Sequence, residues 1–439
     1  MQNRVNRTAI AIVHQGKEAV AKFRIARLGT AAAVLVTAAA ASAQAANWIT
    51  FRYGDTHTGF NNRETTINTS NASSLTNSWN ALTGSWIFNA QNDSFAEHRG
   101  VLFGSGSDFA SVVALNTTDG SVKWQTDLVN PQTQGINLSP PAVANGTVYA
   151  GANYNAEING HPGAMYALSE KTGTPLWSAI SWCNSYIYSP PTVGGGLVYF
   201  GDGFGALTAV DASTGAQVWA VNVFTGDLTC DGNEGEVSGA PVYASNRTLG
   251  NVVYVGADDT AHMVGNFSAY SASTGALLWQ TPMAPVVDTG VLAGGRVFVN
   301  AYDGTVYALN DTTGKVVWSF ATEGGRGLTS APAYANGVVY VSDNDNNLYA
   351  LSARMGTVIW QNHGVAISNT VPTVANGVLY VEGNDEVKAL DASNGNVLFA
   401  AGFTCNDFVG AAVVVNGALY DVGGNQCGGA NLLSKFALP

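Results

Sequence analysis

Apolar and polar positions along this chain form short runs that repeat about every 40 to 60 residues. Each repeat holds four apolar runs of strand length, rich in Val, Tyr and Thr. Such runs predict β-strands, and pairs such as Asn336-Gly337 predict tight hairpins, because both central turn residues take positive φ. The clearest copy, residues 330–360, reads S-A-P, N-G, V-Y-V and L-Y-A-L, and ends with Gly356 and Trp360. Four antiparallel strands per repeat predict one blade of a β-propeller.

The repeated phrase occurs eight times, which predicts an all-β, eight-bladed propeller of four-stranded antiparallel blades. Its central element is found at Val101-Leu102-Phe103, Val148-Tyr149, Val198-Tyr199, Val253-Tyr254, Val297-Phe298, Val339-Tyr340, Leu379-Tyr380 and Leu419-Tyr420. A glycine precedes the last strand at Gly120, Gly173, Gly215, Gly275, Gly314, Gly356 and Gly395. That strand carries an aromatic residue, at Trp124, Trp177, Trp219, Trp279, Trp318, Trp360 and Phe399. We expect these rings to fill the space between neighbouring blades.

The eighth repeat stops at Phe436-Ala437-Leu438 without a last strand. A run resembling that strand lies near the N-terminus, from Leu75 to Leu82 with Trp79. We therefore expect the N-terminal strand to complete the last blade and close the ring, which removes the exposed sheet edges. The predicted domains are a lead-in and closing strand over residues 46–89 and the propeller over 90–439, folded as a single domain.

Residues 1–45 have the features of an export signal. Arg24 and Arg27 precede an apolar run over residues 28–41, and Ala43-Gln44-Ala45 is a small-residue cleavage site. The run is short for a bilayer span, although an uncleaved membrane anchor is the alternative. We expect a mature chain beginning near Ala46 in the periplasm or outside the cell, with no transmembrane anchor after cleavage.

The charge of the mature chain argues against nucleic acid as a partner. Only 11% of residues are charged, and residues after 45 hold 12 basic groups against 29 acidic ones. Such a surface repels a phosphate backbone.

Four cysteines follow the signal, at Cys183, Cys230, Cys405 and Cys427. An even number in an oxidising compartment favours disulfides, and no C-x-x-C spacing suggests zinc or covalent haem. We predict Cys183–Cys230 between loops of consecutive blades and Cys405–Cys427 within the last blade.

The repeats resemble those of the quinoprotein (PQQ-repeat) propeller superfamily, and the preceding segment is similar to the one that opens quinoprotein alcohol dehydrogenases. Two passages carry the second likeness: Trp48, Phe51, Arg52, Gly54, Asp55 and Gly59, then Ile67, Asn68, Asn71, Leu75 and Trp79. The resemblance implies one of two branches: dehydrogenases that need PQQ and Ca²⁺, or cofactor-free scaffolds such as the propeller lipoprotein of outer-membrane assembly. The chain lacks the adjacent cysteines and cytochrome domain of the former and the lipid-acceptor cysteine of the latter.

Ligands of propellers usually bind over the axial channel, where the innermost strands begin. Aligned repeats place eight residues there: Asp93, Ser139, Ser189, Gly239, Asp288, Ser330, Thr370 and Gly410. Charged and amide groups lie next to them, at Glu236, Arg326, Asn369 and Asp407. Glu236, Asp288 and Asp407 are candidate Ca²⁺ ligands; Arg326, Asn369 and Asp93 are candidates for binding a carboxylated quinone; Asp288 is a candidate general base. The structural alternative is that these residues cap strand starts.

Two acidic segments imitate calcium loops. Asp343-Asn344-Asp345-Asn346-Asn347 begins like one, but Leu348 and Arg354 stand where Gly and Glu are required, so we interpret it as a hairpin turn. Residues 231–236, D-G-N-E-G-E, are interpreted as a solvated loop that could hold Ca²⁺. The six histidines show no paired metal spacing, and no G-x-S-x-G motif occurs.

Three functions follow from these observations. The first is an exported, monomeric binding or scaffold propeller, with a protein partner or small ligand at the channel mouth. The second is a PQQ- and calcium-dependent dehydrogenase acting on an alcohol or polyol, and the third is a hydrolase or lyase on the same fold. A channel mouth closed by side chains favours the scaffold over the dehydrogenase.

Overall fold

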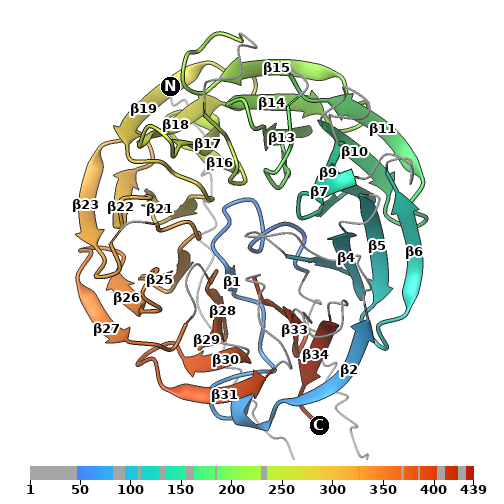
Figure 1. The fold of residues 1–439 in the computed structure, drawn as a ribbon, viewed down its shortest axis with the longest axis vertical. Coiled ribbons are helices and arrows are strands. Elements are labelled where there is room, and N and C mark those ends of the chain that lie inside the picture. Colours follow the sequence, from blue (N-terminus) through green and yellow to red (C-terminus); the bar gives the residue numbers. More distant parts are fainter. Residues whose placement is uncertain are drawn as a thin grey trace, which may run out of the picture. The chain divides into compact units, whose positions relative to one another are not determined.

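The structure, a computed structural model, describes residues 47–82, 94–106, 110–128, 135–154, 163–182, 185–228, 235–325, 327–366, 370–383, 386–402, 411–423 and 432–439. Residues Ala45–Pro439 form one compact unit. In the described part, the strands form eight sheets in a ring, and each sheet has its first strand near the axis and its last strand at the rim (Figure 1). The predicted eight-bladed propeller is confirmed.

The first four blades follow one another along the chain, each ordered from the axis outward. Blade 1 contains β3 (Ala96–His98), β4 (Val101–Gly106), β5 (Ser111–Asn116) and β6 (Val122–Asp127). Blade 2 contains β8 (Ala142–Ala144), β9 (Thr147–Tyr154), β10 (Gly163–Ser169) and β11 (Pro175–Ile180), with β7 (Gly135–Leu138) also paired to β9. Blade 3 contains β12 (Thr192–Gly194), β13 (Leu197–Gly201), β14 (Ala206–Asp211) and β15 (Gln217–Asn222). Blade 4 contains β16 (Val242–Asn246), β17 (Gly250–Asp259), β18 (Val264–Ser271) and β19 (Leu277–Met283).

The remaining blades complete the ring in the same order. Blade 5 contains β20 (Val291–Ala293), β21 (Arg296–Asn300), β22 (Thr305–Asn310) and β23 (Val316–Ala321). Blade 6 contains β24 (Ala333–Ala335), β25 (Val338–Ser342), β26 (Leu348–Ser352) and β27 (Val358–Asn362). Blade 7 contains β28 (Thr373–Ala375), β29 (Val378–Gly383), β30 (Glu386–Asp391) and β31 (Val397–Gly402), with β1 (Phe60–Asn61) parallel to β28. Blade 8 contains β32 (Val413–Val415), β33 (Ala418–Gly423), β34 (Leu432–Ala437) and the N-terminal β2 (Thr76–Leu82).

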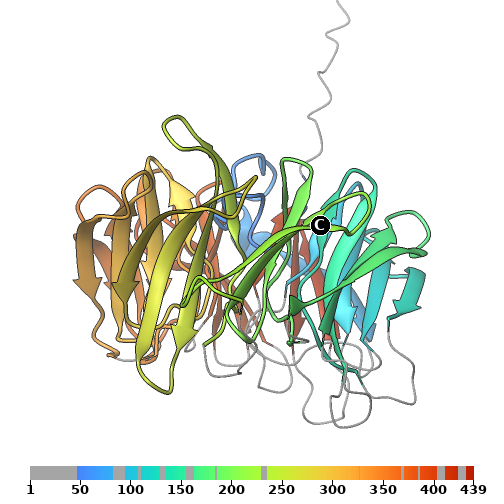
Figure 2. The ribbon, with the colours of Figure 1, turned by 90° about the horizontal axis from the view of Figure 1, so that it is seen from above.

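The strands run between two faces of the ring, seen edge-on in Figure 2. Because neighbouring strands in a blade are antiparallel, the starts of the innermost strands and the turns between second and third strands share one face. We call it the ring face. The opposite, hairpin face carries the turns between first and second strands, such as Asn336-Gly337, whose φ values of 50° and 86° confirm the predicted hairpin.

The hydrophobic core is divided among the contacts between successive blades. The eight larger clusters of buried side chains each join residues of two neighbouring blades, including blade 8 with blade 1. Third strands such as β5 are almost wholly buried, whereas outer strands such as β6 alternate exposed and half-buried residues. Among the described residues, no helix combines the length and apolar character needed to cross a bilayer.

The repeated Trp and Gly make one contact between each pair of blades. Each of these seven repeated Trp residues donates its indole N–H to a backbone carbonyl of the next blade over 2.9–3.1 Å. Its ring lies against the repeated Gly, at which a Cβ would stand 2.5–2.9 Å from the nearest Trp atom. These glycines have φ of 70° to 78°, so both space and backbone require Gly. The pairs are Trp79–Gly120, Trp124–Gly173, Trp177–Gly215, Trp219–Gly275, Trp279–Gly314, Trp318–Gly356 and Trp360–Gly395.

The N-terminal strand closes the ring, as predicted. β2 pairs antiparallel with β34, and Trp79 of β2 packs on Gly120 of blade 1. The chain ends therefore interrupt blade 8 between its third and fourth strands, where the other blades carry the glycine turn. This explains why blade 7 has Phe399 in place of Trp: the ring packs edge-on against Phe436, 5.8 Å away, and near the short helix η1 (Ala72–Ser74).

Candidate functional site

The lead-in segment, residues 47–61, crosses the axial channel and contacts all eight blades in order (Figure 1). It bonds to the innermost strands, or to the residue just before them, through backbone and side-chain groups. The contacts are Trp48 with Glu97, Ile49 with Val143, Thr50 with Pro191, Asp55 with Tyr243, Thr56 with Leu292, Thr58 with Tyr334, Gly59 with Val374 and Asn61 with Val414. Residues 46–89 were predicted as a lead-in and closing strand of the same domain, but this path through the channel was not predicted.

Two lead-in side chains fill the middle of the channel. Phe51 is 1% exposed and packs on Ala240, Val371 and Ala411, which lie two residues before the inner strands of blades 4, 7 and 8. Arg52 is also 1% exposed. The channel is therefore closed by side chains just beneath the ring face.

Arg52 is a buried cation with few partners. Its Nη2 donates to the Pro372 carbonyl over 3.4 Å, while Nε and Nη1 are buried without a hydrogen-bond partner among the described residues. Burial lowers the pKa of Arg52 to about 10, and the charge of Asp288 opposes that shift. The guanidinium stays charged at neutral pH, and Asp288 is the group that compensates it.

Asp288, the candidate base and Ca²⁺ ligand, is engaged by the backbone. Its Oδ1 accepts from the Thr289 amide over 2.6 Å, and its Oδ2 accepts from the Ala331 amide of blade 6 over 2.7 Å. The residue is 4% exposed. Burial raises its pKa, and Arg52 with these N–H donors opposes the rise. Asp288 thus links blades 5 and 6 at the start of an inner strand, in agreement with the structural alternative.

Other residues of the predicted strand-start ring also join blades. The carbonyls of Ser139, Gly239, Ser330 and Thr370 each accept a hydrogen bond from a side chain of the preceding blade, over 2.7–2.9 Å. Ser139, Ser189, Ser330 and Thr370 are at most 1% exposed. These positions hold the inner ends of the blades together.

His57, another residue of the lead-in, is held by contacts of both its ring nitrogens. Its Nδ1 lies 2.6 Å from the Phe51 carbonyl oxygen, and its Nε2 lies 2.9 Å from Thr192 Oγ1 and 3.0 Å from the Pro241 carbonyl oxygen. Burial lowers the pKa of His57 to about 4, so the ring is neutral at neutral pH. It connects the lead-in to blades 3 and 4.

Glu236 lies at the ring face beside a carboxylate that the sequence analysis did not select. Its backbone forms a bridge with Asp258 of β17, and its exposed side chain accepts from Ser238 Oγ over 3.2 Å. Asp258 is 6% exposed, and none of the described residues hydrogen-bonds to its Oδ1. Burial, with the charges of Glu236 and Asp259, raises the pKa of Asp258 to about 7. The signal available in the sequence was the Asp258-Asp259 pair at the end of that strand.

Several predicted residues lie outside the described part of the chain. They are Asp93, Arg326, Asn369 and Asp407 of the candidate site, Gly410 of the ring, and Cys183, Cys230, Cys405 and Cys427. Their roles, and the two disulfide pairings, stay predictions. Among the described residues, no group of three or more His, Cys, Asp or Glu side chains could hold a metal ion.

The segment at Asp343 is a turn, as interpreted from the sequence. Asp343 Oδ1 accepts from the amides of Asp345 and Asn347, and Oδ2 accepts from Tyr349, Gly324 and the Asn347 side chain. All its acceptor capacity is directed at its own hairpin and the adjoining loop.

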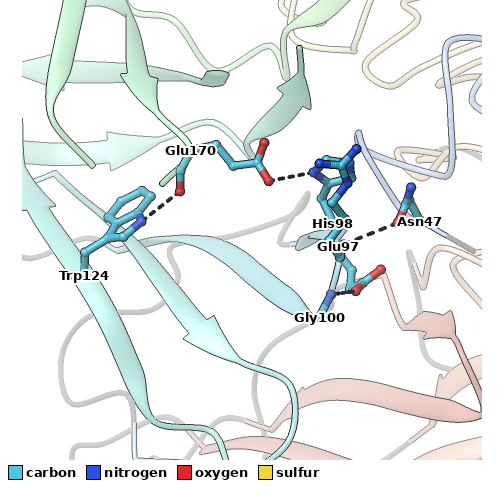
Figure 3. A network of polar contacts seen from close by, with 7 residues as sticks. Asn47, Glu97, His98, Gly100, Trp124 and Glu170 are labelled. Carbon is cyan, nitrogen blue, oxygen red and sulfur yellow. Dashed lines mark hydrogen bonds and ion pairs between the residues drawn. The ribbon is translucent and has the colours of Figure 1, made fainter. Parts of the chain in front are cut away.

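A polar network surrounds the point where the lead-in joins blade 1 (Figure 3). His98 Nδ1 lies 2.6 Å from Glu170 Oε1 of blade 2, and Glu170 also accepts the indole N–H of Trp124 at its carbonyl. Glu97 Oε1 accepts from the Gly100 amide over 2.7 Å, while Oε2 is buried and has no hydrogen-bond partner in the part of the chain that the structure describes. Burial raises the pKa of Glu97 to about 7, so this carboxyl titrates near neutrality.

Comparison with known proteins agrees with this architecture. The outer membrane protein assembly factor BamB of Yersinia pestis is 27% identical over 219 residues, which are 47% of this chain and 51% of that protein. The chain thus spans about half the length of the curated relative. The crystal structure of quinohemoprotein alcohol dehydrogenase from Comamonas testosteroni has a TM-score of 0.73 at 16% identity, covering 90% of this chain and 80% of that one.

BamB from Moraxella catarrhalis superimposes with a TM-score of 0.60 at 18% identity, over 83% of this chain and 97% of that one. At 16% and 18% sequence identity, these two structural matches show only that the fold is shared. The sequence match of a family model is more extensive: it covers residues 76–264 and 264–427. The chain therefore belongs to the PQQ-repeat family described as outer membrane protein assembly factor BamB.

Proposed function

We propose that this chain is an exported propeller that binds a protein partner and performs no catalysis. The observation that carries the proposal is the closed channel: Phe51 and Arg52 fill it beneath the ring face, and Asp288 is held by two backbone N–H groups and the charge of Arg52. A residue so engaged has little capacity left to act as a base or to bind a metal. The BamB-type repeats support an assembly role in the periplasm or outside the cell.

One observation favours a PQQ- and calcium-dependent dehydrogenase as the second candidate. Glu236 and Asp258 are bridged through their backbones at the ring face, the charge of Glu236 helps to raise the pKa of Asp258, and Asp258 Oδ1 is buried without a partner among the described residues. Ca²⁺ binds about six to eight oxygen ligands, so the side chains of Glu236 and Asp258 alone would not complete its coordination. The described residues therefore fit the ion only in part, and we derive no reaction step from them.

Calorimetric titration of the mature chain with PQQ, with and without Ca²⁺, tests the proposal. We expect no saturable heat under either condition. Saturable PQQ binding that requires Ca²⁺ would contradict it, and Arg326→Ala should then weaken binding by about 2 kcal/mol, the scale of one charge-assisted hydrogen bond. Cross-linking in the native host supplies the positive test: a stoichiometric protein partner should be recovered with wild type.

A further inference from the structure

An open cavity of about 640 Å³ lies between blades 4 and 5 on the hairpin face. Its inner side is formed by Asp55 and Thr56 of the lead-in, whose carbonyls accept from the Tyr243 and Leu292 amides. The cavity therefore forms only when the lead-in occupies the channel. It is separate from the strand-start ring and from the Glu236–Asp258 pair, which belong to the opposite face.

Unequal hairpins create this space. The inner strand of blade 4, β16, has five residues and ends at Asn246, whereas β20 of blade 5 has three, ends at Ala293 and is followed by the turn Gly294-Gly295. At Gly295 an added Cβ would meet nothing within 4 Å, and at Gly294 it would meet only the Tyr334 hydroxyl at 4.0 Å. The longer hairpin of blade 4 thus borders the cavity on one side, and on the other side the Gly294-Gly295 turn of blade 5 adds no side chain that would fill it.

Two acidic residues that have no cationic partner among the described residues, Asp55 and Asp311, line the cavity. Asp311 Oδ1 accepts from the Thr312 hydroxyl over 3.0 Å, and no hydrogen bond to the Asp55 carboxylate is found among the described residues. The ion pairs of the described part are His98–Glu170, His262–Asp259 and Lys388–Glu386, so neither carboxylate is neutralised. Burial raises the pKa of Asp55, as expected for an uncompensated carboxylate.

We propose that this cavity binds a protonated aliphatic amine. Asp55 and Asp311 accept hydrogen bonds from its ammonium group, and Tyr243 and Leu292 contact its carbon chain. An ammonium on a short chain offers three donors and one positive charge, which match the acceptors and negative charge of two acidic residues that line one cavity. Its volume is within the range of small-molecule pockets. The amine is either a free small molecule or the end of a lysine side chain. The inference goes beyond the proposed function and does not depend on it.

Titration of the mature chain at low ionic strength with butylamine tests the site, followed by the shifts of backbone amide resonances. We expect saturable shifts that centre on Tyr243, Leu292 and Gly295. Butan-1-ol, which has the same carbon chain without the charge, should bind at least about tenfold more weakly. A lysine-containing peptide is the second arm: tighter binding than butylamine assigns the site to a lysine side chain, and weaker binding assigns it to a free amine.

Two variants and a matched control decide the outcome. Asp55→Asn and Asp311→Asn should each weaken butylamine binding by about tenfold, because each removes one charged acceptor. Asp303→Asn changes the same charge in blade 5 at an exposed position on the ring face, and should bind like wild type. If Asp55→Asn does not fold, Asp311→Asn still gives the answer. Equal binding by Asp311→Asn and Asp303→Asn, equal binding of butan-1-ol, or no saturable shift with wild type would overturn the proposal.

Discussion

At single residues, the repeated Trp and Gly act as one unit, because the indole ring occupies the space in which any Cβ would stand. Burial of single carboxyl groups is a second effect that acts on individual residues. Glu97, Asp202 and Asp258 have pKa values raised to about 7, each mainly by burial, and each keeps one oxygen without a hydrogen-bond partner. We therefore expect measurable effects on stability when the space at a Trp–Gly contact is filled and when a buried carboxyl is replaced.

Gly314→Ala should destabilise the fold more than Gly337→Ala. Both positions have positive φ, 70° and 86°, so both substitutions incur backbone strain of about 1–2 kcal/mol. At Gly314 the added Cβ would also stand 2.5 Å from Trp279, whereas at Gly337 it meets nothing within 4 Å. Overpacking should add about 1–3 kcal/mol at Gly314 only. Urea unfolding measures both, and equal losses would show that the Trp contact is not tight.

Glu97→Gln should flatten the pH dependence of stability between about pH 4.5 and 7. In the folded chain burial raises the pKa of Glu97 to about 7, whereas the unfolded chain ionises near its ordinary value of 4.5. Over that window the unfolded state binds fewer protons, so the free energy of unfolding falls as pH rises. We expect wild type to lose on the order of 2 kcal/mol more than the variant.

The control for this measurement is Glu323→Gln, at an exposed glutamate in the turn after β23. The Glu323→Gln variant should keep the wild-type slope of stability against pH, because it retains Glu97, Asp202 and Asp258, the three carboxyls whose pKa is raised by burial. A Glu97→Gln curve that parallels wild type would contradict the raised pKa.

At the scale of elements, each outer strand is matched to the turn of the next blade. Six of the seven aromatic positions in the outer strands β6 to β31 are Trp and lie against a glycine turn, and the exception, Phe399 of β31, faces blade 8, where the chain ends replace that turn. β2 supplies the missing strand and carries Trp79 to Gly120. The identity of the aromatic residue thus depends on what the neighbouring blade offers.

This dependence predicts opposite outcomes for two exchanges. Trp360→Phe should destabilise by about 1–2 kcal/mol, because it deletes the hydrogen bond to the Ala392 carbonyl and leaves space over Gly395. Phe399→Trp should give no gain, since a larger ring must displace Phe436. Thermal melting compares them, and a stabilising Phe399→Trp would show that blade 8 does accept an indole.

At the scale of the whole molecule, the lead-in connects all eight blades through the channel. Its buried Arg52 compensates Asp288, which in turn receives the amide of Ala331 in blade 6. Arg52 and Asp288 are therefore two buried groups of opposite charge, and removal of one leaves the other uncompensated.

A double-mutant cycle on Arg52 and Asp288 measures this coupling. Arg52→Met alone should destabilise the fold by about 3–5 kcal/mol, because a buried carboxylate loses its compensating charge. The pair Arg52→Met with Asp288→Asn should cost less than the sum of the single changes. Additive losses in urea unfolding would show that the two groups do not interact.

The number of blades, the place of the repeated Trp between blades and the closure by residues 75–82 could all be predicted from the sequence, whereas the contact of each Trp with a Gly of the next blade was found only in the structure. These features depend on strand periodicity and turn chemistry, which are local and recur in phase through the chain. The turn at Asp343 was predictable for the same reason, because its hydrogen bonds lie within one hairpin and the adjoining loop.

Only the tertiary structure decided what occupies the channel and which carboxylates meet. Thr50 reaches Pro191 across 141 positions and Asn61 reaches Val414 across 353, and no local pattern encodes such contacts. Alignment of the repeats placed Asp288 at a strand start, but its engagement depends on Ala331 of the next blade and on Arg52 of the lead-in. The sequence determined the repeating unit, because its interactions are short in sequence. The fold determined the sites, because each one forms where distant segments meet.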